Sequence, residues 1–152
     1  MPTFRAMTES DIEAYIPLRL AQLREEGGAG PDLAPALRDY CRRHLADGSF
    51  FALFALEGER IIGMGGVSVV EKPPWYGCPG GRIGLLSSMY TLPDCRRRGV
   101  AREILTRLLD HARSQDCAAV HVTASEAGMK LYSACSFRPN GRFMEYRLQD
   151  SD

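Results

Sequence analysis

An apolar run, a basic turn with a glycine and a strongly periodic segment follow one another in the middle of the chain. Residues 83–92 are mostly apolar, and the turn Arg96-Arg97-Arg98-Gly99 follows Pro93-Asp94 and Cys95. Apolar residues then recur at helical spacing, at Ala101, Ile104, Leu105, Leu108, Leu109 and Ala112. A strand, turn and helix in this order direct backbone N–H groups, a helix dipole and three arginines to one point. The turn is therefore suited to hold phosphate, and the next strand is expected to run parallel.

Turn signals and apolar periodicity divide the rest of the chain into short elements. Strands are predicted over residues 4–6, 50–56, 60–70, 83–91 and 117–124, and helices over residues 12–26, 32–48, 99–115 and 127–135. Asn140-Gly141 is a strong hairpin signal that predicts two more strands, over residues 137–139 and 142–148. The order β-α-α-β-β-β-α-β-α-β-β predicts one α/β (α+β) domain over residues 1–152. We expect a mixed, twisted sheet of six to seven strands with helices on both faces.

Composition excludes several classes of protein. The 152 residues fit one domain with its own core, and 19 basic residues balance 19 acidic ones, so no net charge favours nucleic acid or an anionic membrane. No stretch approaches the roughly 18 apolar residues of a membrane span. Five cysteines without a CxxC pair predict free thiols, and with three scattered histidines they predict no metal site. The N-terminus lacks the apolar core of a signal peptide, so a cytoplasmic location is expected.

The basic turn also carries a resemblance to a known family. The pattern Arg96-x-x-Gly99-x-Ala101, placed between a strand and an amphipathic helix, resembles the pyrophosphate loop of the GCN5-related N-acetyltransferase (GNAT) superfamily. The predicted order of elements matches that superfamily over nearly the whole chain. The resemblance implies that the pyrophosphate of acetyl-CoA is held by Arg96, Arg97, Arg98, Gly99, Val100 and Ala101. A solvated basic helix start with a turn glycine is the alternative interpretation.

The resemblance gives roles to the strand before the loop as well. In the family this strand parts from its neighbour, and the pantetheine arm pairs with the exposed backbone as an added strand. By offset from Arg96, the residues beside acetyl-CoA would be Met89, Tyr90 and Thr91. The Met89 N–H would face the thioester carbonyl and stabilise the developing oxyanion. Because only the backbone acts, the Met89 side chain can still belong to the core.

A second motif follows the strand predicted over residues 117–124. Residues 125–137, SEAGMKLYSACSF, resemble the family pattern Asn-x-x-Ala-x-x-Leu-Tyr-x-x-x-Gly-Phe. Three positions depart from it, with Ser125, Gly128 and Ser136 in place of Asn, Ala and Gly. The match implies that Ser125 and Tyr132 contact acetyl-CoA and that Tyr132 protonates the departing thiolate as general acid. Packing is the alternative role for Tyr132.

The general base is left open by the sequence. Glu71, at a strand end beside the expected acceptor cleft, is the first candidate, and Glu126 and His121 are the others. Trp75 and Tyr76, in the loop over residues 71–81, are expected either to line the acceptor pocket or to cover the edge of the core.

Together these features predict an enzyme that moves an acetyl group from acetyl-CoA to a primary amine, by direct attack in a ternary complex. The single domain and neutral charge favour a small-molecule acceptor. The alternative is a non-catalytic acyl-CoA-binding or sensor protein, because Ser125 and Ser136 replace the Asn and the Gly of the second motif and the base is unassigned. A nucleic-acid-binding domain is disfavoured by the neutral charge. Homodimers are frequent in the family, but the sequence identifies no interface.

Overall fold

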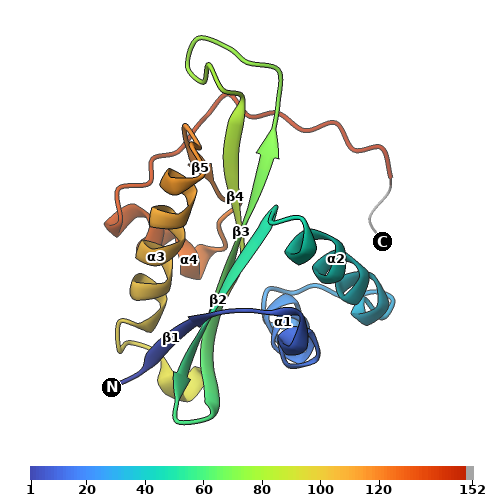
Figure 1. Cartoon of the computed structure of the whole chain (residues 1–152), viewed down its shortest axis with the longest axis vertical. Helices are drawn as coiled ribbons and strands as arrows, with labels where there is room; N and C mark the ends of the chain where they lie inside the picture. The colour runs from blue at the N-terminus through green and yellow to red at the C-terminus, as the bar shows by residue number, and fades with distance from the viewer. Residues whose placement is uncertain (150–152) are drawn as a thin grey trace.

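A five-stranded sheet forms the centre of the computed structural model, which describes residues 1–149 (Figure 1). The strands lie in the order in which they occur in the chain: β1 (Thr3–Ala6), β2 (Phe50–Glu57), β3 (Arg60–Glu71), β4 (Arg82–Thr91) and β5 (Val120–His121). Neighbours from β1 to β4 are antiparallel, and β5 is parallel to β4. This mixed sheet confirms the predicted fold class.

Helices cover both faces of the sheet. In chain order they are η1 (Glu9–Asp11), α1 (Ile12–Glu25), α2 (Ala34–Ala46), η2 (Pro93–Cys95), α3 (Val100–Ser114) and α4 (Glu126–Ala134). Helices α1 and α2 lie on one side of the sheet and α3 and α4 on the other (Figure 1). Alternating residues of β2 reach both cores, since Leu53 and Ala55 face α3 whereas Ala52 and Phe54 face α1 and α2.

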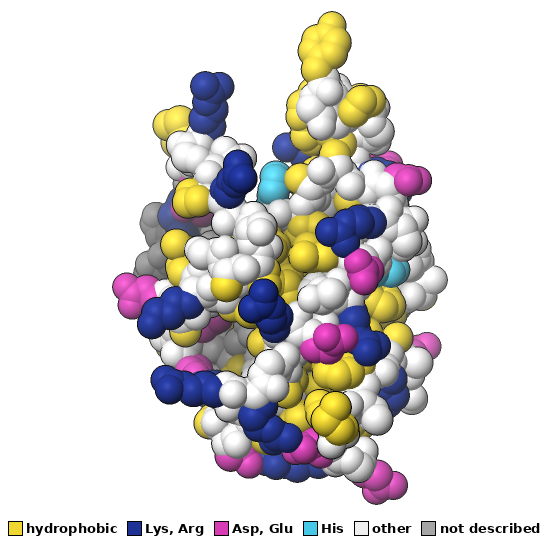
Figure 2. All heavy atoms as spheres, turned by 90° about the vertical axis from the view of Figure 1, so that its left-hand side faces the viewer, with side chains coloured by type: hydrophobic (Ala, Val, Ile, Leu, Met, Phe, Trp, Pro, Cys, Tyr) yellow, Lys and Arg dark blue, Asp and Glu magenta, His cyan; other side chains and the backbone are white. Residues whose placement is uncertain are grey.

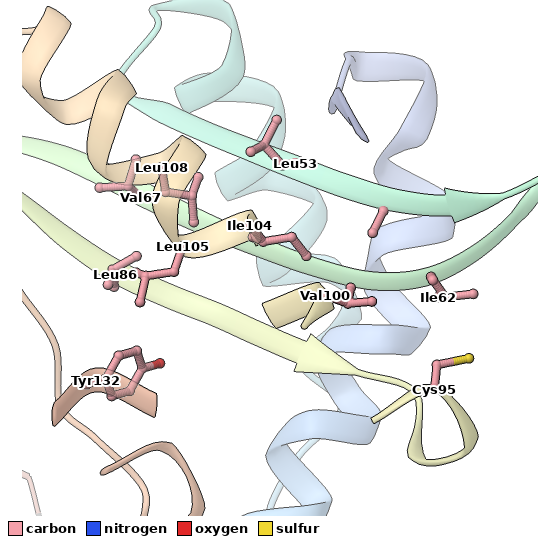
Figure 3. Close-up of a cluster of buried hydrophobic side chains, with 11 residues drawn as sticks. Leu53, Ile62, Val67, Leu86, Cys95, Val100, Ile104, Leu105, Leu108 and Tyr132 are labelled. Carbon is pink, nitrogen blue, oxygen red and sulfur yellow. The ribbon is translucent and has the colours of Figure 1, made fainter. Parts of the chain in front are cut away.

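The packing of α3 sets the position of the loop before it. Ile104, Leu105 and Leu108 are 0% exposed and form the centre of the core cluster on this face (Figure 3). Burial of each such side chain contributes about 1.5–3 kcal/mol. Val100, in the first turn of the helix, belongs to the same cluster. The N-terminus of α3 is therefore fixed beside the end of β4.

The C-terminal side of the sheet differs from the prediction. Strand β5 holds two residues instead of residues 117–124, and residues 137–139 and 142–148 form no strand in the described part of the chain. The Asn140-Gly141 signal yields only a turn, in which the Phe143 N–H approaches the Asn140 carbonyl at 3.5 Å. A hairpin is marginally stable alone and needs a third strand or a packed face. The expected six to seven strands therefore become five.

The structure also bears on the membrane spans, metal sites and disulfides that were considered from composition. Among residues 1–149, no helix is long and apolar enough to cross a membrane. The same residues contain no group of three or more metal-ligating side chains. All five cysteines are free thiols.

Candidate active site

A bulge near the end of β4 forms the centre of the candidate site. Two residues, Ser88 and Met89, lie there opposite the single residue Gly65 of β3. Ser88 has a left-handed backbone, with φ +61°. Its buried hydroxyl is 2.7 Å from the hydroxyl of Tyr15, which comes from α1. A hydrogen bond between buried groups thus ties the bulge to the helix below it.

Strands β4 and β5 part just before this bulge. Their parallel pairing is confined to Gly84 with Val120 and Leu85 with His121. Strand β4 then runs on to Thr91 without a β5 partner in the described residues. Unpaired backbone groups along a strand edge can bind an extended ligand as an added strand.

The C-terminal end of α1 closes one side of the site. The side-chain amide of Gln22, a buried residue, donates to the Met89 carbonyl at 3.1 Å and approaches Glu26 Oε1 at 3.5 Å. Because the same nitrogen makes both contacts, the Glu26 carboxylate lies within two hydrogen-bond lengths of the Met89 carbonyl. Arg19 donates to Gln22 Oε1 at 2.8 Å and so fixes the orientation of the amide. Neither Gln22 nor Glu26 was recognised from sequence.

The loop after η2 presents backbone donors at the start of α3. Gly99 has φ +79°, and a Cβ at that position would meet no atom within 4 Å, so backbone conformation alone favours glycine. The N–H groups of Val100 and Ala101 lie in the first turn, where no intrahelical acceptor exists. The helix dipole adds partial positive charge at the same point, which makes it an anion-binding position.

The three arginines of this loop have different surroundings. Arg96 forms an ion pair with Glu25 at 2.7 Å, and Arg98 forms one with Glu57. These contacts lower the pKa of both carboxyl groups, chiefly through the hydrogen bonds from the guanidinium groups. Arg97 is exposed and forms no ion pair with any described residue. The structure therefore leaves Arg97 available to a ligand, whereas Arg96 and Arg98 hold the loop to α1 and β2.

Tyr90 and Thr91 also contact Arg96. The Arg96 guanidinium lies 5.6 Å from the centre of the Tyr90 ring, and its Nε donates to the Thr91 carbonyl at 2.9 Å. Arg96 thus occupies one of the two acceptor positions of the Thr91 carbonyl. These contacts join the end of β4 to the loop.

Tyr132 lies on α4, on the same core face as Leu86 (Figure 3). Ser125 caps this helix by accepting a hydrogen bond from the Gly128 N–H at 3.1 Å. A Cβ on Gly128 would lie 2.8 Å from Tyr132 Cε2, so the glycine makes room for the ring. Burial raises the pKa of Tyr132, and the negative charge of Glu26 raises it further. The phenol is therefore kept protonated, as a proton donor must be.

Glu71, Trp75 and Tyr76 lie away from this site. Glu71 pairs with Arg82 at the start of β4, seven residues or about 23 Å along the strand from Met89. The two side chains form an ion pair at 2.9 Å. The loop that carries both aromatic residues extends beyond the same end of the sheet (Figure 1). The structure thus does not bring these three residues to the bulge.

His121 and Glu126, the other candidate bases, lie on the opposite side of the gap from α1. His121 is exposed on β5 opposite Leu85, and Glu126 is the exposed first residue of α4. Figure 2 shows this side of the molecule, where hydrophobic side chains gather along a furrow.

A fourth strand that bulges and parts from the fifth, next to a helix start suited to anions, is the arrangement that the resemblance to the GNAT superfamily implies. The chain belongs to the acetyltransferase (GNAT) family, whose model matches residues 13–137. The recognition made from the basic turn is therefore confirmed.

Solved structures agree with this assignment. The chain is similar to a predicted acetyltransferase with acetyl-CoA from Clostridium acetobutylicum, with 28% identity over 97% of both chains and a TM-score of 0.94. It is also similar to a GCN5-related N-acetyltransferase from Ralstonia eutropha, with 25% identity, 98% of this chain and 100% of that chain covered, and a TM-score of 0.89. An aminoglycoside N-acetyltransferase, AAC(6')-Iy, in complex with CoA shares the fold, with 22% identity, 99% and 96% coverage and a TM-score of 0.78. No curated protein sequence matches significantly.

Proposed function

We propose that this protein transfers the acetyl group of acetyl-CoA to a primary amine of a small molecule, by direct attack in a ternary complex. The observation that carries the proposal is the parting of β4 from β5 at a bulge, between the N-terminus of α3 and the buried Tyr132. The acetyl-CoA in the similar Clostridium structure supports the same donor here. A cytoplasmic location is part of the proposal, since the five free thiols fit a reducing compartment.

The donor would lie along the open edge of β4 and across the start of α3. Arg97 and the first N–H groups of α3, at Val100 and Ala101, would bind the pyrophosphate. The backbone of residues 89–91 would pair with the pantetheine arm, and Ser125 would cap α4 beside it. The Met89 N–H would then donate to the thioester oxygen as negative charge develops there.

Two side chains would handle the protons. Glu26 would accept a proton from the acceptor ammonium, directly or through one water, because its carboxylate lies close to the Met89 backbone. The freed amine forms the new C–N bond as the C–S bond breaks. Tyr132 then gives its phenolic proton to the departing thiolate, and the tetrahedral nitrogen loses its second proton to solvent. Tyr132 is reprotonated from solvent, and Glu26 releases to solvent the proton that it took, which restores both groups for the next turnover.

The test follows acetyl-CoA consumption by chromatography over a panel of small primary amines, because a thiol reagent would also react with the protein's own cysteines. We expect turnover of at least one amine. Glu26→Gln should lower kcat, whereas Glu71→Gln, at the far end of β4, should leave kcat unchanged.

Binding of acetyl-CoA without consumption over the whole panel would instead establish a non-catalytic acyl-CoA-binding protein. Equal effects of Glu26→Gln and Glu71→Gln on kcat would contradict only the role of Glu26 as the base.

A further inference from the structure

One side of α1 carries a row of polar side chains that faces the bulge of β4. Its members, Tyr15, Arg19, Gln22 and Glu26, follow one another at helical spacing, which places them within about 60° of one another around the helix axis. The first and the third members form hydrogen bonds with the two bulge residues of β4. Arg19 lies between these two members and therefore faces the same part of β4.

The charge of Arg19 has no opposite charge beside it in the described residues. Arg19 forms no ion pair within residues 1–149, whereas Glu13 and Glu25 of the same helix pair with other arginines. Its side chain donates one hydrogen bond, from Nη1 to Gln22 Oε1 at 2.8 Å. Its Nε is buried without a hydrogen-bond partner in this part of the chain. A guanidinium that water solvates only in part gains more from an anionic partner than one fully surrounded by water.

Gln22 places Arg19 and Glu26 at the two ends of a single amide group. The amide oxygen accepts from Arg19, and the amide nitrogen donates to the Met89 carbonyl at 3.1 Å and approaches Glu26 Oε1 at 3.5 Å. A cation and a carboxylate thus lie a few bond lengths apart beside the Met89 backbone. This pair is complementary to a molecule that carries an ammonium and an anion a few bonds apart.

The orientation of Gln22 does not by itself require a charge at position 19. Any side chain with an N–H or O–H group could donate to the amide oxygen. A partly buried cation in this place costs free energy unless an opposite charge reaches it. We therefore look to the ligand for the opposite charge.

We propose that the acceptor is an amine that carries a carboxylate or a phosphate a few bonds from its nitrogen, and that Arg19 binds this anionic group. The inference rests on the proposed function, because it concerns the acceptor of the same transfer. The ammonium of the acceptor would face Glu26, and the anion would accept from the guanidinium N–H groups that Gln22 does not use. Carboxylates and phosphates both accept two parallel hydrogen bonds from a guanidinium, so Arg19 suits either group.

The test compares the steady-state kinetics of matched acceptors. The set holds α-, β- and γ-amino carboxylates and 2-aminoethyl phosphate, each beside its neutral carboxamide or alcohol. In the wild type, kcat/KM for at least one anionic acceptor should exceed that for its neutral counterpart at least about tenfold. The series with the larger ratio identifies the anion as a carboxylate or a phosphate. Turnover with equal kcat/KM for anionic and neutral acceptors would overturn the proposal.

Three substitutions on α1 isolate the charge of Arg19. Arg19→Gln keeps an N–H donor for Gln22, so KM for the anionic acceptor should rise about ten- to a hundredfold at nearly constant kcat. The neutral counterpart should be unaffected, which also shows that the variant is folded. Arg19→Lys keeps the charge and should recover part of the preference. Arg24→Gln removes an exposed arginine from the opposite side of the helix and should keep the wild-type preference.

A positioning role for Arg19 alone gives a different result. Arg19→Gln would then lower kcat equally for anionic and neutral acceptors, or would change nothing, and either result would contradict the proposal.

Failure of acetyl transfer is also distinguishable from failure of this inference. No turnover of any acceptor, anionic or neutral, would contradict the proposed function itself. Ligand-detected NMR of the same acceptors, with CoA in place of acetyl-CoA, then measures their binding without turnover. Binding of an anionic amine that is lost in Arg19→Gln would support the site, and no preference for the anionic amines would overturn it.

Discussion

At the scale of single residues, Tyr132 shows how burial prepares a phenol to donate a proton. Its pKa is raised above the ordinary value of 10.0, first by burial and then by the Glu26 carboxylate. A raised pKa means that the folded protein holds the phenolic proton more tightly than the unfolded chain does. Any stability that this proton contributes is fully present below pH 10, the ordinary pKa, and is lost as the pH rises through the higher pKa of the folded state. Tyr132 therefore remains a proton donor over the whole physiological range.

Tyr132→Phe is expected to lower kcat by roughly 10²–10⁴-fold, the usual contribution of a general acid, and to change the dissociation constant of acetyl-CoA little. Steady-state kinetics with an accepted amine and calorimetric titration measure the two quantities. Tyr76→Phe, on the distant loop, is the control and should be silent. An unchanged kcat in Tyr132→Phe would assign this tyrosine to packing only.

Gly128 is a departure from the family pattern that the structure explains. A methyl group there would crowd the Tyr132 ring, so Gly128→Ala should shift the ring and lower kcat by roughly ten- to a hundred-fold. The free energy of unfolding should change little, because the helix preference of alanine over glycine, about 1 kcal/mol, offsets the crowding of the Tyr132 ring. Gly80→Ala, in open space, is the matched control for both kcat and melting temperature. Full activity in Gly128→Ala would show that the ring position is not set by this glycine.

At the scale of elements, the bulge of β4 depends on a helix far from it in sequence. Tyr15 and Ser88 share a buried hydrogen bond of 2.7 Å, and Tyr40 and Ser68 share one of the same length at a more exposed place. The pair allows a matched comparison of two tyrosine-to-phenylalanine changes.

Tyr15→Phe should cost about 1–3 kcal/mol, because the Ser88 hydroxyl is left buried without a partner, and it should weaken acetyl-CoA binding several-fold. Tyr40→Phe should cost less, since water can reach Ser68, and it should leave binding unchanged. Urea denaturation and calorimetric titration give the two values. Equal effects of the two substitutions on acetyl-CoA binding would show that the bulge does not contribute to the donor site.

The elements themselves were predictable to different degrees. The strand ending at Thr91 and the helix near residues 99–115 were predicted from apolar runs and periodicity, which are local and act wherever the chain lies. The hairpin at Asn140-Gly141 was not formed, because a strand also needs an edge to pair with, and turn chemistry carries no information about that edge.

At the scale of the whole molecule, some residues of the candidate site lie in local sequence motifs, and others are brought together only by the packing of distant segments. The loop at residues 96–101 and Tyr132 lie in compact motifs, so their resemblance to a family could be seen in the sequence. Glu26 and Gln22 approach Met89 only because α1 packs against β4, a contact between segments more than 60 residues apart. The position of Glu71 could have been inferred, since a β3–β4 hairpin pairs its end with the start of β4 rather than with Met89.

The most direct test of the acetyl-CoA site is calorimetric titration of acetyl-CoA into the wild type and two charge-reversal variants. Arg97→Glu should weaken binding by at least about tenfold, since Arg97 is the loop arginine without an ion pair to a described residue and its charge would meet the pyrophosphate. Arg113→Glu, the same change near the far end of α3, should bind as the wild type does. Absence of binding to the wild type, or equal binding by all three proteins, would contradict the site at the end of β4.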